Sequence, residues 1–156
     1  MSTANSSAFL NIKRQSGHYY ITLLAKYNAS DKAYTEKIDF ILDTGAFITV
    51  ISRDIAVMFG YDKLPKIPSK IKGYTGESPA DFVRIPGLKV LNVELVDLPV
   101  LIPHEKELKQ NILGLNVLEY FEYLVETKKD KITISLNTNP RHYHKVLECG
   151  QVIVDS

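Results

Sequence analysis

Residues 37–52, KIDFILDTGAFITVIS, form the stretch of sequence that decides the fold of this chain. A mainly apolar run over residues 38–42 leads into Asp43-Thr44-Gly45, and a second β-rich run over residues 47–51 leaves it. A carboxylate between two such runs is costly, because a charge removed from water needs a partner or a proton. Glycine after Asp-Thr permits a tight turn that brings backbone N–H groups close to the carboxylate. We therefore expect Asp43 to be presented at the bottom of a cleft as a functional acid.

The composition favours one β-rich domain. The chain has 156 residues, of which 45% are hydrophobic, which suits a single domain with one core. Nine Tyr and six Phe, together with many β-branched residues, favour strands. The net charge of +1 gives no indication of a nucleic acid partner or of an anionic membrane surface. We expect an all-β fold with no nucleic acid and no membrane as partner.

The ends of the sequence show no recognisable targeting signal. Residues 1–15 lack a basic segment followed by an apolar one, so no signal peptide is expected. No apolar run approaches the roughly 20 residues that span a bilayer. The expectation is a cytoplasmic protein with a disordered lead over residues 1–8, one domain over residues 9–136 and a C-terminal extension over residues 137–156.

Turn residues divide the first half of the domain into two strands and a helix. Strands are expected over residues 17–27 and 33–42, where β-branched and aromatic residues are frequent. A helix over residues 53–59 is expected to begin after Ser52, acting as its N-cap, and to end at Gly60. This places a short helix soon after the Asp43 turn.

The second half is expected to be sheet with one more helical segment. After a connector over residues 64–68, a hairpin is expected with Gly73, Tyr74, Thr75 and Gly76 at its tip. Ile112-Leu113-Gly114 is interpreted as an apolar strand that reaches a glycine, followed by about two helical turns. Further strands are expected over residues 83–93, 96–102, 123–127 and 131–136.

The order of these features resembles that of the retropepsin-like aspartic proteases, the single-domain relatives of pepsin. The likeness covers residues 19–136 and is carried by Asp43-Thr44-Gly45-Ala46 with its apolar flanks and by Ile112-Leu113-Gly114 before a helix. It implies a closed β-barrel with one or two short helices, in which these two segments cross at the floor of a cleft. It also implies that residues 73–76 form a flap that closes over the substrate.

The same resemblance implies that a homodimer hydrolyses peptide bonds. Such a reaction needs one ionised carboxyl to deprotonate the attacking water and one protonated carboxyl to polarise the carbonyl. The sequence holds one Asp-Thr-Gly, so the second acid has to be the Asp43 of a second copy, across a twofold axis. By resemblance, Thr44 bonds across this axis, while Gly45 and Ala46 support the active-site turn. The resemblance implies no metal and no cofactor, and its partners are a second copy and a protein or peptide substrate.

The chain departs from the retroviral pattern beside the Asp43 turn. Retroviral members carry acidic residues after Asp-Thr-Gly-Ala and an Arg after the later glycine, and these form a bracing ion pair. This chain has Phe47, Ile48 and Leu115 there. Because buried ion pairs are often no better than apolar contacts, we expect packing of these three residues to replace the ion pair. By a looser comparison, Tyr74 could close over the substrate as the flap tyrosine of pepsin-like enzymes does.

Two other kinds of protein also fit the sequence. The domain could be a catalytically silent retropepsin-like module for dimerisation or peptide binding. It could also be a small-molecule-binding β-barrel in which Asp43 only caps a turn. The resemblance favours the protease over both.

The C-terminal segment carries separate expectations. His142 and His144 lie two positions apart, but no further ligand stands at metal-binding spacing, so no metal site is expected. Cys149 has no base visibly paired with it, and as a lone cysteine it excludes an internal disulfide. By resemblance to the retroviral enzymes, whose chain ends pair into an intersubunit sheet, residues 145–154 are expected to supply such a strand.

Overall fold

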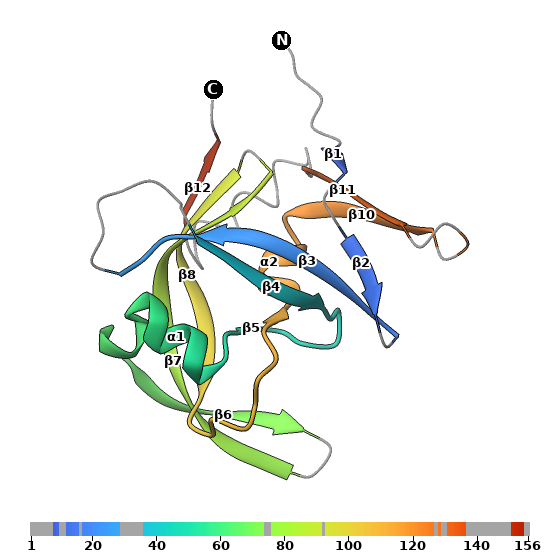
Figure 1. Cartoon of the computed structure of the whole chain (residues 1–156). Coiled ribbons are helices and arrows are strands. Elements are labelled where there is room, and N and C mark those ends of the chain that lie inside the picture. The colour runs from blue at the N-terminus through green and yellow to red at the C-terminus, as the bar shows by residue number, and fades with distance from the viewer. Residues whose placement is uncertain are drawn as a thin grey trace.

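The structure is a computed structural model that describes residues 8–9, 12–15, 17–28, 36–73, 76–91, 93–126, 128, 131–136 and 151–154 (Figure 1). Its strands are β1 (Ala8–Phe9), β2 (Ile12–Gln15), β3 (His18–Ala25), β4 (Glu36–Leu42), β5 (Thr49–Val50), β6 (Ile67–Gly73), β7 (Gly76–Val90), β8 (Val93–Pro103), β9 (Ile112–Leu113), β10 (Phe121–Glu126), β11 (Lys131–Leu136) and β12 (Gln151–Val154). The helices are α1 (Arg53–Phe59), the 3-10 helix η1 (Tyr61–Lys63) and α2 (Leu115–Leu118). The described part of the chain is mostly strand with short helices, which confirms the prediction of a β-rich fold.

Most of the strands belong to one sheet, whose hydrogen-bonded neighbours follow the order β12-β8-β5-β9-β4-β3-β7-β6. β7 also pairs with β8, so the path of pairings that leaves β8 through β5 returns to it through β7. β2 pairs with β3, and β1, β11 and β10 form a separate three-stranded sheet. β6 and the first part of β7 form a hairpin that projects from the other strands at the bottom of Figure 1.

Strand β9 determines how the Asp43 region is built, because its two neighbours in the sheet are β4 and β5. β4 runs parallel to β9, with Leu42 opposite Leu113. On the other side, β5 runs antiparallel to β9, with Val50 opposite Ile112. Residues 43–48 connect β4 to β5 and therefore have to pass over the end of β9. The chain order alone thus brings the Asp43 turn onto the segment that contains Gly114.

The crossing at Gly114 is tight enough to exclude a side chain. A Cβ atom built on Gly114 would lie 2.7 Å from the carbonyl carbon of Ile48 and 2.9 Å from the carbonyl oxygens of Ala46 and Ile48. Gly114 itself has φ −94° and ψ −179°, an extended conformation that any residue adopts. The glycine is therefore required by the approach of a second backbone segment and not by its own dihedral angles.

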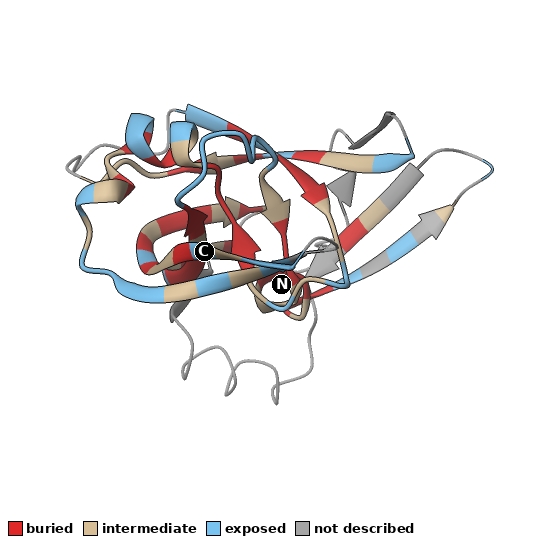
Figure 2. Ribbon diagram, turned by 90° about the horizontal axis from the view of Figure 1, so that it is seen from below, coloured by how far each residue is buried: buried red, intermediate tan, exposed pale blue. Residues whose placement is uncertain are grey.

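A single apolar core holds the strands around this crossing (Figure 2, red). Ile21, Leu23 and Ala25 are buried at alternate positions of β3, as the two-residue period of a strand requires. Helix α1 adds Ala56 and Phe59 to the same core. The largest fully buried side chains are Tyr61, Phe40, Phe59, Ile21, Ile38, Ile51, Ile85, Leu88, Leu95, Ile102, Leu113 and Leu118. Both strands that lead to the Asp43 crossing, β4 and β9, are thus anchored in the core.

Helix α1 has the bounds predicted from the sequence, but it begins differently. It ends at Gly60, which has the left-handed φ of 79° that favours glycine there. The prediction that Ser52 caps the first turn is wrong, because its side chain makes no capping hydrogen bond. Ser52 is instead buried, and its backbone N–H donates to Oδ1 of Asn111 at 2.8 Å. A contact with a distant part of the chain therefore determines how this residue is placed.

Several other boundaries also differ from the prediction: Val93, predicted as the end of a strand, begins β8, and the strand predicted over residues 123–127 is β10 (Phe121–Glu126). Ile67 and Pro68, predicted as part of a connector, are the first residues of β6. Proline is tolerated there because β6 lies at the end of the sheet order, where an N–H is not needed on the outer edge. Helix α2 has one turn instead of the predicted two, since the chain enters β10 at Phe121, which pairs with Leu136.

Strands near both ends of the chain lie within this subunit. Ala8, assigned from the sequence to the N-terminal lead, pairs with Ile134 in β11. β12 runs antiparallel to β8 of the same chain, with Gln151 opposite Val96. The intersubunit role expected for residues 145–154 stays a prediction. Within the chain, β12 adds a strand to the sheet beside β8.

The tight crossing gives a first prediction: Gly114→Ala lowers the free energy of unfolding by about 1–3 kcal/mol, the usual cost of overpacking. The reason is that the added methyl group meets backbone atoms, which cannot rotate away. Urea unfolding followed by circular dichroism measures the change.

Gly45→Ala is the matched control for this measurement. Its added Cβ would meet only a side-chain oxygen of Asp43, at 3.1 Å. We expect a smaller loss of stability, because a side chain moves more easily than backbone. Equal losses in the two variants would contradict the interpretation of the crossing.

Candidate active site

The Asp43 carboxylate is held by the backbone of its own turn. Asp43 follows β4 directly, and its N–H donates to the Leu113 carbonyl oxygen at 3.2 Å. The N–H of Gly45 donates to Oδ1 of Asp43 at 2.9 Å, and the N–H of Ala46 donates to the Asp43 carbonyl oxygen at 3.2 Å. A hydrogen bond from a backbone N–H to a carboxylate is charge-assisted, so it orients the group strongly. One carboxylate oxygen is thereby held in place.

The turn lies on the surface of the subunit. Asp43 is half-buried, whereas Thr44 and Gly45 are exposed. Gly45 leaves room for its N–H to approach the carboxylate, because a Cβ atom there would come within 3.1 Å of Oδ1. The acid is therefore at the surface and is oriented by a rigid turn.

The segment after Gly114 donates backbone hydrogen bonds to the loop that contains Asp43. The N–H of Leu115 donates to the Ala46 carbonyl oxygen at 2.8 Å, and the N–H of Asn116 donates to the Phe47 carbonyl oxygen at 3.1 Å. These N–H groups lie in the first turn of α2 and have no partner inside the helix. The structure thus brings Asp43-Thr44-Gly45-Ala46 and Ile112-Leu113-Gly114 together, as two crossing segments joined by backbone hydrogen bonds.

A polar pair, the buried Thr49 and the half-buried Asn116, locks the crossing and was missed from the sequence. Oδ1 of Asn116 accepts hydrogen bonds from the Thr49 N–H at 2.8 Å and from its hydroxyl at 2.9 Å. The Thr49 hydroxyl oxygen in turn accepts from the N–H of Gly114 at 3.1 Å. Nδ2 of Asn116 donates to the Pro99 carbonyl oxygen at 2.8 Å. Polar residues inside apolar runs were the signal that could have indicated this pair.

A second asparagine, Asn111, has a similar role at the start of β9. Oδ1 of Asn111 accepts from the Ser52 N–H at 2.8 Å, and Nδ2 donates to the Asp39 carbonyl oxygen at 3.2 Å. Its own carbonyl oxygen accepts from the N–H of Ile41 at 2.8 Å. Asn111 and Asn116 flank β9 and Gly114, so the strands on both sides of the Asp43 turn are bonded to this segment.

The expected packing of Phe47 in place of an ion pair is wrong within the subunit. The Phe47 side chain is 80% exposed, while Ile48 and Leu115 are half-buried. Its carbonyl oxygen is held by the Asn116 N–H, as described above, whereas its ring gains little cover from this chain. A large apolar side chain thus stands at the surface four positions after Asp43.

The hairpin of β6 and β7 carries the predicted flap residues. Gly73 and Gly76 pair at the end of the two strands, and Gly76 has φ 120°, a conformation open to glycine. Tyr74 and Thr75, between them, lie outside the described residues. The structure therefore provides the hairpin, and the roles assigned to its tip stay predictions.

The described residues provide no metal centre. They contain no group of three or more His, Cys, Asp or Glu side chains that could hold a metal ion. His142, His144 and Cys149 lie outside the described part of the chain. None of the helices described is long and apolar enough to cross a membrane.

Comparisons with known proteins agree on one family. The sequence model described as "Aspartyl protease" matches residues 31–117. The crystal structure of a retropepsin-like aspartic protease from Rickettsia conorii superimposes with a TM-score of 0.61 at 22% sequence identity, over 84% of this chain and 99% of that one. No curated protein sequence matches the chain. The matched region contains both crossing segments.

The Thr49–Asn116 pair yields a stability prediction. Asn116→Ala removes the acceptor of the buried Thr49 N–H and the donor to Pro99, so unfolding becomes easier by about 1–3 kcal/mol per unsatisfied group. Thermal denaturation and chemical denaturation both report this change.

Asn28, which like Asn116 is half-buried, provides a comparison, since its Nδ2 donates to the Gly60 carbonyl oxygen at 3.1 Å. Asn28→Ala is expected to cost clearly less than Asn116→Ala, because it removes the bond to Gly60, whereas Asn116→Ala removes three bonds, one of them from the N–H of the fully buried Thr49. A cost for Asn116→Ala no larger than that of Asn28→Ala would show that the pair does not lock the crossing.

Proposed function

Since the chain belongs to the aspartyl protease family, we propose that it is a retropepsin-like endopeptidase that acts as a homodimer. The observation that carries the proposal is the Asp43 carboxylate, held by the Gly45 N–H on an exposed turn above the Gly114 crossing. The retropepsin-like fold of the Rickettsia protein supports the architecture that this reaction needs. The fold is compatible with the closed barrel expected from the sequence.

The proposed chemistry requires two Asp43 carboxyls about 3 Å apart, which share one proton because both cannot be ionised at that distance. The ionised carboxyl takes a proton from the attacking water, and the protonated one donates a hydrogen bond to the scissile carbonyl oxygen. The apparent pKa values then belong to the pair rather than to either residue. Since the chain has one Asp-Thr-Gly, a second copy supplies the second carboxyl.

The exposure of the turn supports the homodimer. Thr44 and Gly45 are exposed in one subunit, so they are free to meet the same turn of another copy across a twofold axis. Two surface cavities of about 430 and 440 Å³ lie elsewhere, and neither is lined by Asp43 or Gly114. In the proposed enzyme the substrate cleft forms between two subunits.

The β6–β7 hairpin is proposed as the flap. Its tip, residues 73–76, would close over an extended peptide that binds as an added strand between the flap and the Asp43 turns. Phe47, exposed beside the turn, would then be covered by the second subunit or by the substrate. The proposed substrate class is therefore a protein or peptide in extended conformation.

Replacement of the proposed catalytic acid tests the mechanism. Asp43→Asn keeps an oxygen to accept the Gly45 N–H but cannot ionise, so we expect cleavage of a denatured protein or peptide library to fall by at least about 10²–10⁴-fold. The assay covers about pH 3 to 7, because a carboxyl pair that must hold one shared proton acts only over part of the pH scale.

Asp39→Asn is the matched control, because Asp39 is an exposed carboxylate on the same strand, β4. It is expected to leave cleavage unchanged. Cleavage that survives Asp43→Asn would refute the mechanism. A wild-type protein that binds peptides as a stable dimer but cleaves none would be a silent module.

Mixed subunits test the shared site. If each active site needs two copies of Asp43, about a tenfold excess of Asp43→Asn subunits leaves roughly one wild-type subunit in eleven with a wild-type partner. Cleavage per wild-type subunit should fall to about one-tenth after the two proteins are refolded together. The same excess of Asp39→Asn subunits, which are themselves expected to be active, should raise cleavage per wild-type subunit about elevenfold. An unchanged rate with Asp43→Asn would mean that one subunit contains the whole site.

A further inference from the structure

A single carboxylate lies at the root of the β6–β7 hairpin. Near the tip, residues 76–79 of β7 pair only with β6. Residues 80–82 of β7 pair with β6 on one side and with β8 on the other, and Asp81 pairs with Pro68 of β6 and Ile102 of β8. Asp81 therefore occupies the point at which the hairpin leaves the sheet. A contact made there controls the angle of the hairpin relative to the rest of the subunit.

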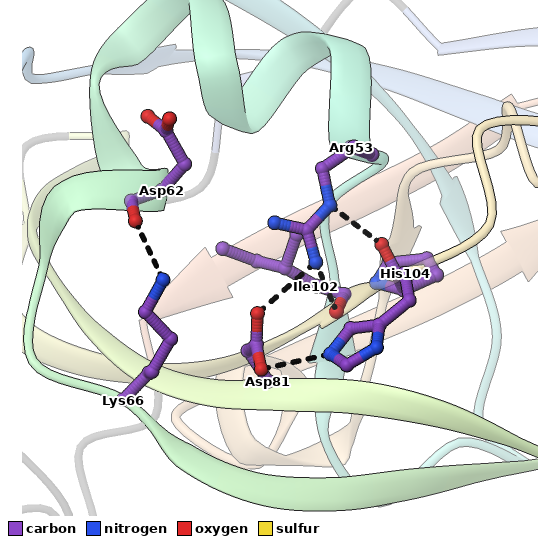
Figure 3. Close-up of polar contacts among 7 residues, drawn as sticks. Arg53, Asp62, Lys66, Asp81, Ile102 and His104 are labelled. Carbon is purple, nitrogen blue, oxygen red and sulfur yellow. Dashed lines mark hydrogen bonds and ion pairs between the residues drawn. The ribbon is translucent and has the colours of Figure 1, made fainter.

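Both oxygens of the Asp81 carboxylate are bonded to side chains of other elements (Figure 3). Nη2 of Arg53 donates to Oδ2 at 3.1 Å, and Nε2 of His104 lies 2.9 Å from Oδ1. The Asp81 and Arg53 side chains are 14% and 15% exposed, and that of His104 is 48% exposed. Contacts between a carboxylate and charged donors are strong where water is largely excluded.

The two partners carry these contacts into the body of the subunit. Arg53 is the first residue of α1, and its Nε donates to the Pro103 carbonyl oxygen at 2.9 Å. The backbone N–H of His104 donates to the Pro79 carbonyl oxygen at 3.1 Å, so the residue after β8 is also hydrogen-bonded to the hairpin. α1 follows the Asp43 loop through β5 and Ser52. Asp81 thus links the hairpin to the element that comes directly after the crossing.

Building on the proposed function, we propose that Asp81, Arg53 and His104 form a clamp that positions the flap for closure over the substrate. They are positioning residues, since among the described residues their side chains bond one another and the carbonyl oxygens of Ile102 and Pro103, and not the Asp43 turn. The clamp fixes the hairpin root to α1 and to the end of β8. Closure therefore bends the part of the hairpin between its tip and Ala80, and not the root at Asp81. Loss of the clamp leaves the catalytic turn intact but lets the whole hairpin swing.

The charge on Asp81 is suited to acid conditions. Burial alone would raise the pKa of Asp81, but the hydrogen bonds and charges of His104 and Arg53 outweigh it and hold that pKa below its usual value. The opposite residues on β6 and β8, Pro68 and Ile102, carry no charge. Because the pKa of Asp81 is lower in the folded protein than in the unfolded chain, its ionised form stabilises the fold at any pH above the ordinary pKa of Asp. This stabilisation is lost as the pH falls through the lowered pKa of the folded protein. The clamp therefore stays intact in mildly acid solution, above the lowered pKa of Asp81.

Asp81→Asn tests the clamp by two readouts on the full-length protein. Amide hydrogen exchange of residues 67–82 should become about tenfold faster or more, while residues 36–50 keep their protection. In the peptide assay, with rates normalised to folded protein, kcat/KM near pH 5 should fall about tenfold. The deficit should shrink at lower pH, where wild-type Asp81 also becomes protonated. His104→Gln, at a half-exposed position that folding tolerates, should show a smaller effect of the same kind.

Glu77→Gln is the matched control on the same strand. It breaks the exposed ion pair of Glu77 with Lys70, at 3.3 Å, which contributes little because water competes for both groups. Exchange and cleavage should stay within about twofold of wild type. Unchanged exchange in Asp81→Asn would overturn the clamp, and altered exchange with unchanged kcat/KM would overturn its role in catalysis. A wild-type protein without cleavage would refute the proposed protease and the positioning role together, while exchange would still decide whether the clamp orders the hairpin.

Discussion

The close approach of two backbone segments at Gly114 is the constraint on which the candidate site depends. Because β9 lies between β4 and β5, the loop that carries Asp43 has to cross its end, and at 2.7 Å from the Ile48 carbonyl carbon there is no space for a Cβ atom. The crossing allows N–H groups of α2 to bond the loop carbonyl oxygens. Without that contact, the carboxylate would stand on a loop with no fixed orientation.

The polar groups at this crossing form a connected set. Asn116 accepts hydrogen bonds from Thr49, and the Thr49 hydroxyl oxygen accepts one from the N–H of Gly114. Asn111, just before β9, accepts from the Ser52 N–H and donates to the Asp39 carbonyl oxygen of β4. Buried polar groups stabilise a structure only when each has a partner, and here the partners come from both crossing segments. Such a set favours one arrangement of the turn over all others. This rigidity matters for acid–base chemistry, because a proton moves only between groups held at hydrogen-bonding distance.

The subunit combines this rigid floor with a projecting hairpin. The floor is built from backbone hydrogen bonds and close packing, whereas the hairpin between its tip and Ala80 depends on pairing between β6 and β7 and on the bond from the His104 N–H to the Pro79 carbonyl oxygen. Asp81 stands between the two regions and is bonded to Arg53 and His104 from the body. An arm that moves about a fixed base suits an enzyme that must admit an extended peptide and then exclude water from it. In the proposed homodimer, the exposed Phe47 and the exposed turn would face the second subunit.

The sequence by itself determined the features that depend on local chemistry. The Asp43 turn, the glycine at 114 and the helix that ends at Gly60 were all predictable, because turn residues and apolar periodicity act over a few neighbouring positions. Only the tertiary structure decided which polar side chains bond one another and which apolar side chains stay exposed. Asn116 bonds Thr49, 67 positions away, and Phe47 stays exposed, because the crossing of distant segments sets both outcomes. Contacts of this range depend on the path of the whole chain, and no local pattern encodes that path.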